Sequence, residues 1–244
     1  MTAAGATSPR SARFERGDRV VHVRCSTRAD GDFHLEMDPV VLDHRRQSFM
    51  PGSWTQLDEV HGTNVVAVQR PGEFDRVEGD AAITACLGAV LAVWVGDCAP
   101  VVLLGDDGAV GVVHAGWRGA LAGVLQAAVA AMPSQRVDAV LGPCIHPCCY
   151  EFGADDLERV TDRYGSSVVA STRWGSSALS MPAVVSAALD EVGVGLESLS
   201  RCTCCSPDTF FSHRRGERGR QVMTVTSMRA ASATRTSKEV PHER

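Results

Sequence analysis

The chain has 244 residues, a hydrophobic fraction of 44%, a charged fraction of 22% and a net charge of −5. These values are typical of a globular protein with one large α/β domain or two small ones, and they exclude wholesale disorder. Because the interior carries no dense Lys/Arg block, we expect no nucleic-acid partner. No apolar run reaches the ~18–20 residues that span a bilayer, so we expect no membrane association either.

The N-terminus is polar and lacks the apolar core of a secretory signal, which favours a cytoplasmic location. The nine cysteines are then expected to be reduced thiols that pack or bind metal. Residues 1–16 and 229–244 are rich in small, hydroxyl and basic side chains without periodicity. We predict a flexible N-terminus at 1–16, one domain at 17–228 and a flexible C-terminal tail at 229–244.

The middle of the chain contains the most readable elements. In chain order, the pattern predicts one or two strands within 81–95, strands at 101–104 and 109–114 joined by a turn at 105–108, a helix over 119–132, and a strand at 137–141. Helices over 155–164 and from Ser180 to Gly193 follow, then a strand at 220–226. Strands and helices mix without strict βαβ alternation. The sequence therefore favours a layered α/β (α+β) fold with mixed sheets in a single domain.

The turn Gly105–Gly108 brings two candidate metal ligands together. Folding the strands back on a centre between residues 106 and 107 places Cys98 beside His114 or one residue diagonal to it, where Cα atoms lie roughly 4.5–5.5 Å apart. Zinc binds Cys sulfur and His nitrogen, and catalytic zinc sites use three protein ligands plus an open position. His61, followed by Gly62, is the best third ligand. The alternatives are a small buried hydrophobic residue for Cys98 and a satisfied polar group for His114.

Several motifs match a known family. His114-Ala-Gly-Trp-Arg-Gly119, Asp97-Cys98-Ala-Pro100 and Val60-His61-Gly62 resemble the YfiH-like family, also labelled multicopper polyphenol oxidase or laccase-domain proteins. Further matches are Gly79-Asp80-Ala81 with Thr84, Gly142-Pro-Cys-Ile145, Cys149-Tyr-Glu151 and Phe210-Phe-Ser-His-Arg-Arg215. The resemblance covers roughly residues 22–228. It implies a layered α/β/β/α sandwich and a zinc ion on His61, Cys98 and His114.

The resemblance also implies activity on purine nucleosides. It implies phosphorolysis of adenosine, inosine and methylthioadenosine, and deamination of adenosine, so that purine nucleoside and phosphate are the expected small-molecule substrates. Zinc is the expected cofactor, and copper is less favoured. The chain departs from the family at Glu59, where Gln is usual, at Gly96, where Ala is usual, and at His213, where Tyr is usual. These differences leave the substrate preference open.

Three other functions remain as alternatives. They are a zinc hydrolase that edits muramyl amino-acid precursors of peptidoglycan, a copper-dependent polyphenol oxidase, and a non-catalytic partner protein stapled by zinc. One His/Cys/His set in a chain with eight histidines is too small for a multicopper cluster. Three ligands also fit a structural zinc poorly, because such sites are usually four-coordinate.

Polar residues near the ligands are candidates for substrate chemistry. Asp97 is a candidate catalytic residue that orients a ligand or shuttles a proton, with a turn-forming role as the alternative. Arg118, at the start of the predicted helix, is the second candidate catalytic residue and suits phosphate or carboxylate, with a surface ion pair as the alternative. Arg28, Arg214 and Arg215 are weaker anion-binding candidates.

Six cysteines form two clusters, Cys144/Cys148/Cys149 and Cys202/Cys204/Cys205. A second, structural zinc site is one interpretation, and we favour packed or site-adjacent thiols. Trp117 is either a platform for base stacking or a core aromatic residue, and we favour the core. The oligomeric state is left open by the sequence, and a monomer is compatible with it.

Overall fold

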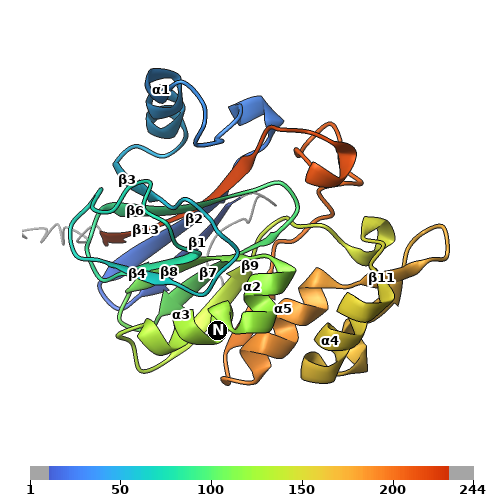
Figure 1. Ribbon diagram of the computed structural model, residues 1–244. Coiled ribbons are helices and arrows are strands. Elements are labelled where there is room, and N and C mark those ends of the chain that lie inside the picture. The colour runs from blue at the N-terminus through green and yellow to red at the C-terminus, as the bar shows by residue number, and fades with distance from the viewer. Residues whose placement is uncertain (1–10, 231–244) are drawn as a thin grey trace, which may run out of the picture.

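The computed structural model describes residues 11–230, which form four layers in the order α/β/β/α (Figure 1). Two mixed sheets lie face to face, with α1 on the outer side of one sheet and the remaining helices on the outer side of the other. The predicted layered α/β fold with mixed sheets in a single domain is thus confirmed. Within 11–230, no helix has the length and apolar character needed to cross a membrane.

The first sheet has five strands, and all but one of its pairings are antiparallel. Their order is β1 (Ser11–Arg16), β2 (Arg19–Cys25), β13 (Gln221–Arg229), β6 (Ala89–Val95) and β3 (Ser53–Gln56), with β3 and β6 parallel. The folded part therefore begins earlier than the predicted boundary at residue 17, and its last strand runs to Arg229. Residues 1–10 and 231–244 of the predicted flexible ends lie outside the described residues.

Helix α1 (Pro39–Phe49) covers this sheet and was not predicted. The side chain of Asp38 accepts hydrogen bonds from the backbone N–H groups of Val40 and Val41, at 3.0 and 3.1 Å, and Pro39 occupies the first turn. An N-terminal Asp-Pro pair is a helix-start signal that the sequence contained.

The second sheet has six strands and carries most of the candidate site. Their order is β12 (Gly195–Ser198), β9 (Val137–Leu141), β7 (Ala99–Gly105), β8 (Val110–Ala115), β5 (Ala81–Thr84) and β4 (Val65–Val68). The outer pairs, β12–β9 and β5–β4, are parallel, and the inner pairs are antiparallel. The predicted strand region 81–95 is two strands, β5 and β6, which belong to different sheets.

The alternation of side chains along β7 divides the apolar core. Val102 and Leu104 point between the two sheets, whereas Val101 and Leu103 point towards the helices, because successive side chains of a strand face opposite sides. All four are buried. A strand covered on both faces reads as a continuous apolar run, which is why residues 101–104 were recognisable as a strand.

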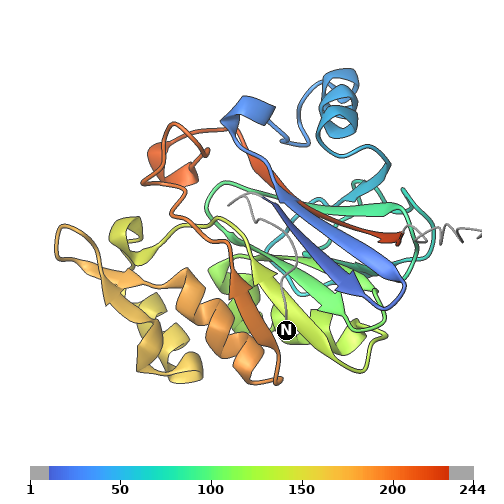
Figure 2. The same ribbon diagram turned by 180° about the vertical axis from the view of Figure 1, so that it is seen from behind.

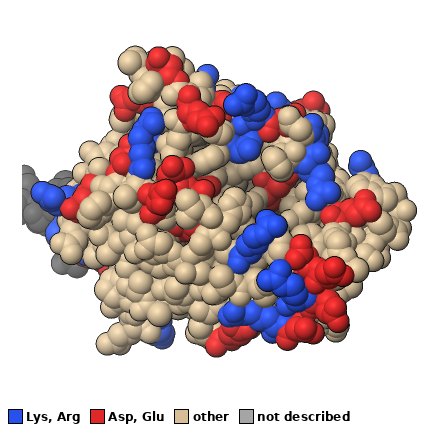
Figure 3. Space-filling model, viewed as in Figure 1, with Lys and Arg blue, Asp and Glu red and all other residues tan. Residues whose placement is uncertain are grey.

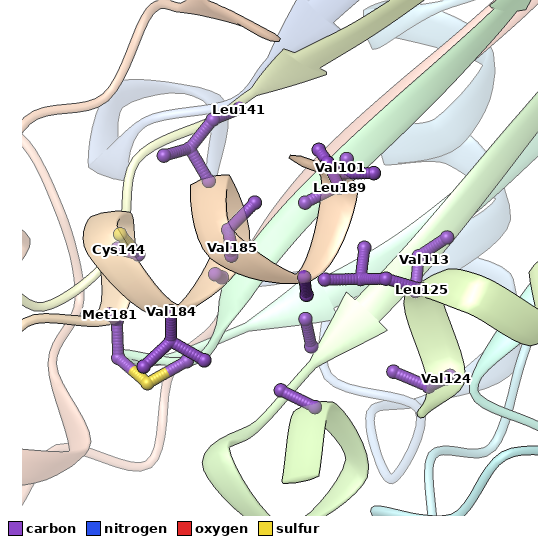
Figure 4. Close-up of a cluster of buried hydrophobic side chains, with 14 of the residues drawn as sticks. Val101, Val113, Val124, Leu125, Leu141, Cys144, Met181, Val184, Val185 and Leu189 are labelled. Carbon is purple, nitrogen blue, oxygen red and sulfur yellow. The ribbon is translucent and has the colours of Figure 1, made fainter. Parts of the chain in front are cut away.

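Four helices cover the outer face of the six-stranded sheet: α2 (Trp117–Ala122), α3 (Val124–Ala131), α4 (Ala154–Tyr164) and α5 (Met181–Asp190). Figure 4 shows Val185 and Leu189 of α5 and Leu125 of α3 beside Val101 and Val113 of the sheet.

Two of these helices depart from the predicted boundaries. The single helix predicted over 119–132 is wrong in one respect, because Gly123 has φ +98° and divides it into α2 and α3. Ser180 caps α5 as predicted, its hydroxyl accepting from the N–H of Ala183 at 3.4 Å, and the helix ends before Gly193, at Asp190.

The remaining elements are short. They are the hairpin β10 (Val169–Ser171) and β11 (Ser177–Leu179), and the 3-10 helices η1 (Arg28–Asp30), η2 (Pro147–Cys149), η3 (Ser166–Val168) and η4 (His213–Arg215). Figure 2, seen from behind, shows the strands β1, β2 and β13 of the first sheet facing the viewer, with α4 and α5 at the other end of the molecule.

The register of the β7–β8 hairpin differs by one residue from the prediction. Pro100 lies opposite His114, and Ala99 lies opposite Ala115. Gly108, at φ +81°, allows a three-residue loop, so the hairpin is centred on Asp107. Cys98 is therefore two positions from the partner of His114. Because side chains two positions apart share a face, this shift brings Cys98 and His114 to the same side.

Candidate metal centre

The structure brings the three predicted metal ligands together from three separate parts of the chain. His61 lies in the loop between β3 and β4, Cys98 directly precedes β7, and His114 is the penultimate residue of β8. Their donor atoms all lie within 4.8 Å of one another. Sγ of Cys98 is 3.7 Å from Nε2 of His61, and the two imidazole rings are 4.8 Å apart at 83°.

These separations fit a divalent metal with sulfur and nitrogen ligands. Tetrahedral zinc with bonds of about 2.3 Å to sulfur and 2.0–2.1 Å to nitrogen places the two atoms about 3.6 Å apart. The Cys98–His61 separation of 3.7 Å is close to that value. His114 is buried, Cys98 is half-buried and His61 is exposed, so the set is open on the His61 side. The described residues thus contain a His/Cys group that could hold a metal ion.

Asp80 fixes two of the ligands and was not assigned a role from the sequence. Its carboxylate accepts hydrogen bonds from the backbone N–H groups of His61 and Gly62, at 2.8 and 2.6 Å, and lies 2.9 Å from Nδ1 of His114. A carboxylate can only accept, so the Nδ1 proton of His114 points to Asp80 and leaves Nε2 free for a metal. Asp80 also holds His61 at φ +60°, a conformation unusual for residues other than glycine.

The ligands also shift one another's protonation. Burial by itself raises the pKa of Cys98, but the charge of His114 and hydrogen bonds from both imidazoles outweigh it and lower the pKa to about 6. Burial lowers the pKa of His114, but Glu59, Cys98 and Asp80 outweigh it and raise that pKa well above its ordinary value. At neutral pH Cys98 is therefore a thiolate, the form that binds metal, while His114 is protonated in the metal-free site, so a metal bound at Nε2 replaces that proton.

Glycines of the His114–Gly119 motif allow α2 to approach the His61 loop. A Cβ atom on Gly116 would lie 2.6 Å from Cδ2 of His61 and 3.3 Å from Sγ of Cys98. A Cβ atom on Gly119 would lie 3.1 Å from the carbonyl oxygen of Gly62. The motif thus serves the packing of the metal ligands, which explains its small residues in physical terms.

We expect Gly116→Ala to weaken zinc binding by roughly tenfold or more, because relieving the overlap with His61 costs about 1–3 kcal/mol. A competition titration with a chromophoric chelator measures this. Gly153→Ala is the matched control, since Gly153 also precedes a helix and has a similar backbone conformation, and a Cβ atom added there would meet no atom within 4 Å. Equal zinc affinity in the two variants would contradict the packing role of Gly116.

Glu59 lies beside Nε2 of His114, whereas Asp80 lies beside Nδ1. One carboxyl oxygen accepts from the N–H of Trp94 at 2.7 Å, and the other lies 3.6 Å from Nε2 of His114. Burial raises the pKa of Glu59 to about 8, although the charge of His114 opposes this. In the metal-free site the carboxyl group of Glu59 is therefore mostly protonated at neutral pH. In the sequence, Glu59 stood out only as a departure from the family's Gln.

The structure places Asp97 in a network with the segment that follows β12. Its carboxylate accepts from the hydroxyls of Thr203 and Ser212, at 2.6 and 2.8 Å, and from the backbone N–H of Arg214 at 2.7 Å. With its oxygens used in this way, Asp97 ties this segment to the neighbourhood of Cys98. The sequence left a ligand-orienting role and a proton shuttle open for Asp97, and we propose the positioning role.

The predicted anion-binding arginines fall into two groups. Arg28 binds the carboxylate of Glu217 and the carbonyl oxygen of Pro207, and Arg215 binds Glu217 and the carbonyl oxygens of Thr203 and Cys204. These two guanidinium groups are used within the protein.

Arg118 and Arg214 are exposed, and neither forms an ion pair with a described carboxylate. Arg118 lies over the ring of Trp117 at 4.4 Å, and Arg214 lies over the ring of Tyr150 at 5.2 Å. Phe152 contacts both rings edge-on, at 5.3 and 5.2 Å, so the three aromatic residues form one wall with a guanidinium at each end. Trp117 is half-buried in this wall, packed against the core. Figure 3 shows the molecule from the same side as Figure 1. Basic side chains gather on the right half of that side, next to a hollow near its centre.

Glu217 anchors the segment that carries Ser212 and Arg214. Its carboxylate accepts from the N–H of Ser212 at 2.8 Å and pairs with Arg28 and Arg215. Burial alone raises the pKa of Glu217, but the bonds from Arg215, Ser212 and Arg28 outweigh it and lower the pKa to about 2.

Because this pKa is lower in the folded than in the unfolded state, the stabilisation is present above about pH 4.3 and is lost as the pH falls towards 2. We expect Glu217→Gln to reduce the free energy of unfolding by about 1–2 kcal/mol at neutral pH, with the difference from wild type narrowing below about pH 4. Urea unfolding at several pH values measures this. A difference that stays constant with pH would show that the carboxylate charge is not responsible.

Comparison with known proteins identifies the family. The sequence profile described as multi-copper polyphenol oxidoreductase laccase matches residues 41–228. A protein of Xylella fastidiosa named purine nucleoside phosphorylase is 38% identical over 204 residues, covering 77% of this chain and 78% of its own. The Escherichia coli protein named purine nucleoside phosphorylase YfiH is 32% identical over 187 residues, covering 72% and 75%. The chain belongs to the YfiH-like family.

Solved structures of similar proteins agree with the YfiH-like fold. The Neisseria meningitidis protein NMB0706 superimposes with a TM-score of 0.75 at 23% identity, covering 89% of this chain and 99% of its own. The hypothetical protein YfiH of Bacillus licheniformis gives a TM-score of 0.73 at 20% identity, covering 90% and 97%. The family resemblance inferred from the motifs around His61, Cys98 and His114 is thus confirmed.

Proposed function

We propose that this YfiH-like protein is a zinc-dependent purine nucleoside phosphorylase that also deaminates adenosine. The observation that carries the proposal is an open His/Cys/His set, His61, Cys98 and His114, beside two exposed guanidinium groups without carboxylate partners among the described residues. Relatives that are 38%, 33% and 32% identical over the matched residues are named purine nucleoside phosphorylase, which supports the phosphorylase part of the proposal.

The aromatic wall and its two guanidinium groups suit both proposed substrates, the purine nucleoside and phosphate. Arg118 and Arg214 present planar donors that match phosphate oxygens. Between them, the rings of Trp117, Phe152 and Tyr150 offer apolar surface against which a purine can pack. Asp97 holds the backbone of Arg214, and so positions one of the two guanidinium groups.

Proton control comes from the chain's own carboxyl groups. A zinc ion held by His61, Cys98 and His114 would supply Lewis-acid chemistry at this point. Asp80 keeps the proton of His114 on Nδ1, so that Nε2 stays directed at the ligand set. In phosphorolysis the glycosidic C–N bond breaks, phosphate oxygen bonds to the sugar and the departing purine takes up a proton. Glu59, whose carboxyl group lies 3.6 Å from Nε2 of His114, is our candidate donor.

The test combines metal analysis of the purified protein with turnover of adenosine in the presence of phosphate. Adenine and ribose 1-phosphate are the expected products of phosphorolysis, and inosine is the expected product of deamination. Cleavage of a muramyl-serine precursor without turnover of nucleosides would instead support the editing hydrolase. Oxidation of a phenol with copper bound, but not with zinc bound, would support the polyphenol oxidase.

Removing one guanidinium tests the phosphate site separately. We expect Arg118→Met to raise the KM for phosphate by about tenfold or more, because a charge-assisted hydrogen bond contributes about 1.5–3 kcal/mol. Zinc content and kcat at saturating phosphate should change little. Arg136→Met, which removes an exposed guanidinium at the turn end of the β7–β8 hairpin, is the control. An unchanged KM for phosphate in Arg118→Met would remove Arg118 from the substrate site.

A further inference from the structure

A second group of metal-binding side chains lies outside the His/Cys/His set. The Sγ atoms of Cys148, Cys149, Cys202 and Cys205 all lie within 4.8 Å of one another. We propose that these four cysteines form a structural zinc site with four thiolate ligands. The site is separate from the proposed catalytic metal, and its ligands all differ from His61, Cys98 and His114.

Two distant segments supply the four ligands. Cys148 and Cys149 belong to η2, which follows β9, and Cys202 and Cys205 lie in the turn that follows β12. The first segment, η2, lies next to β11 at the end of the molecule that carries α4 (Figure 1). Cys205 of the second segment meets Cys148 and Cys149 there. The parallel strands β9 and β12 emerge side by side, which brings the two segments together.

The sulfur geometry fits a closed four-coordinate site. Sγ of Cys205 lies 3.3 Å from Sγ of Cys148 and 3.2 Å from Sγ of Cys149. Four sulfurs around zinc at about 2.3 Å lie about 3.8 Å apart, whereas a disulfide needs about 2.0 Å. All nine cysteines of the chain are free thiols in the structure. Small outward shifts of these sulfurs therefore admit the ion without breaking a covalent bond.

Backbone contacts support the thiolates. The backbone N–H of His146 donates a hydrogen bond to Sγ of Cys202 at 3.5 Å. Metal ligands are commonly supported by hydrogen bonds of this kind. Two backbone hydrogen bonds hold Cys202 against the first segment. The N–H of Cys144 donates to the carbonyl oxygen of Arg201 at 3.2 Å, and the N–H of Thr203 donates to that of Cys144 at 3.0 Å. Cys149 and Cys202 are buried, whereas Cys205 is exposed, so the ion has an entry from solvent.

The sequence contained half of this signal. Cys202 and Cys205 are separated by two residues, the spacing usual for one half of a structural zinc site. The other half is an adjacent pair, Cys148-Cys149, which is not a typical zinc spacing. The interpretation of these cysteines as packed thiols overlooked the spacing of Cys202 and Cys205, and only the fold shows that the two halves meet.

The position of the site gives it a structural task. The turn at 202–205 contains Thr203, whose hydroxyl bonds Asp97, and its carbonyls at 203 and 204 accept from Arg215. Zinc at this point would hold the segment that carries Ser212 and Arg214 against the residue before Cys98. Loss of the ion should loosen one wall of the proposed active site without removing the catalytic metal.

Counting zinc in matched variants tests the proposal. Metal-free protein prepared with a chelator under reducing conditions is titrated with zinc, and bound zinc is measured after removal of the excess. We expect about two ions for the wild type, one for Cys98→Ala, and one for the double variant Cys148→Ser/Cys205→Ser, since each change removes one site. Cys86→Ser, which alters a half-exposed thiol outside both groups, should retain two.

X-ray absorption at the zinc edge identifies the ligands directly. Cys98→Ala loaded with one zinc should show sulfur alone bound to the ion, at about 2.3 Å. Zinc should also raise the thermal midpoint of Cys98→Ala but not of Cys98→Ala combined with Cys148→Ser/Cys205→Ser. This second measurement keeps the test valid even if one variant is less stable.

Three results would overturn the proposal. The first is one zinc ion in the wild type and none in Cys98→Ala. The second is nitrogen or oxygen bound to the ion in zinc-loaded Cys98→Ala. The third is a disulfide between Cys205 and Cys148 or Cys149, found by mass spectrometry in protein purified without oxidant. None of these results depends on the phosphorylase activity.

Discussion

Replacing Cys98 with Ala is expected to remove zinc from the His/Cys/His set and to abolish phosphorolysis. The thiolate is the charged ligand of the set, and its pKa of about 6 keeps it ionised at neutral pH. Without it, only the imidazoles of His61 and His114 remain. We expect zinc affinity at this set to fall by more than about a hundredfold, beyond the 10–100-fold typical of residues that support a ligand. Chelator competition and steady-state turnover of adenosine with phosphate measure the two effects.

The control for this variant is Cys86→Ala, since Cys86 lies outside both cysteine-containing groups. It should retain zinc and activity. Because a second zinc site is proposed at Cys148, Cys149, Cys202 and Cys205, the residual zinc of Cys98→Ala must be assigned before its activity is interpreted. Full activity of Cys98→Ala after loss of the first zinc would remove the metal from the proposed mechanism.

Asp80→Asn is expected to weaken zinc binding about 10–100-fold and to destabilise the metal-free protein by about 3 kcal/mol. The carboxylate of Asp80 is fully buried and serves three donors, from His61, Gly62 and His114. An amide supplies one acceptor oxygen and an N–H group, so at least one donor loses its partner. Zinc competition and urea unfolding of the metal-free protein separate the two effects.

Asp75→Asn provides the comparison for Asp80→Asn. Asp75 also accepts a backbone N–H, from Gln56 at 2.9 Å, and pairs with Arg46, but it has no bond to the metal ligands. It should lose stability while keeping zinc affinity. If Asp80→Asn binds zinc as tightly as Asp75→Asn, then Asp80 does not orient His114 or the His61 loop.

Counting residues outward from the predicted turn of the hairpin accounts for part of the candidate site. The apolar run at 101–104, the turn at 105–108 and the strand at 109–114 were sufficient to pair Cys98 with His114, because an antiparallel hairpin relates residues by simple counting. The count was off by one, since the left-handed Gly108 makes a three-residue loop. This one-residue shift in register decides whether the side chains of Cys98 and His114 lie on the same face of the hairpin.

The other ligand and its support depended on long-range structure. His61 followed chiefly from the family resemblance, because its place beside Cys98 is set by hydrogen bonds to Asp80, 19 residues further along the chain. Helix α1 and strands β1 and β2 were not predicted, although Asp38-Pro39 marked the helix start. The predicted helix is broken at Gly123, which adopts a left-handed conformation. Tertiary packing decides this break, and the local sequence pattern did not predict it.

For the YfiH-like chain, the sequence by itself determined the layered mixed fold, the family and the residue types able to hold a metal. Apolar periodicity, turn residues and short motifs are local, so they can be read without coordinates. Only the tertiary structure decided which arginines remain open to an anion, since Arg28 and Arg215 meet Glu217 while Arg118 and Arg214 meet aromatic rings. It also decided that the two cysteine clusters meet, because β9 and β12 are distant in sequence and adjacent in the sheet. Charge partners and ligand sets are properties of distance in space, which spacing along the chain does not fix.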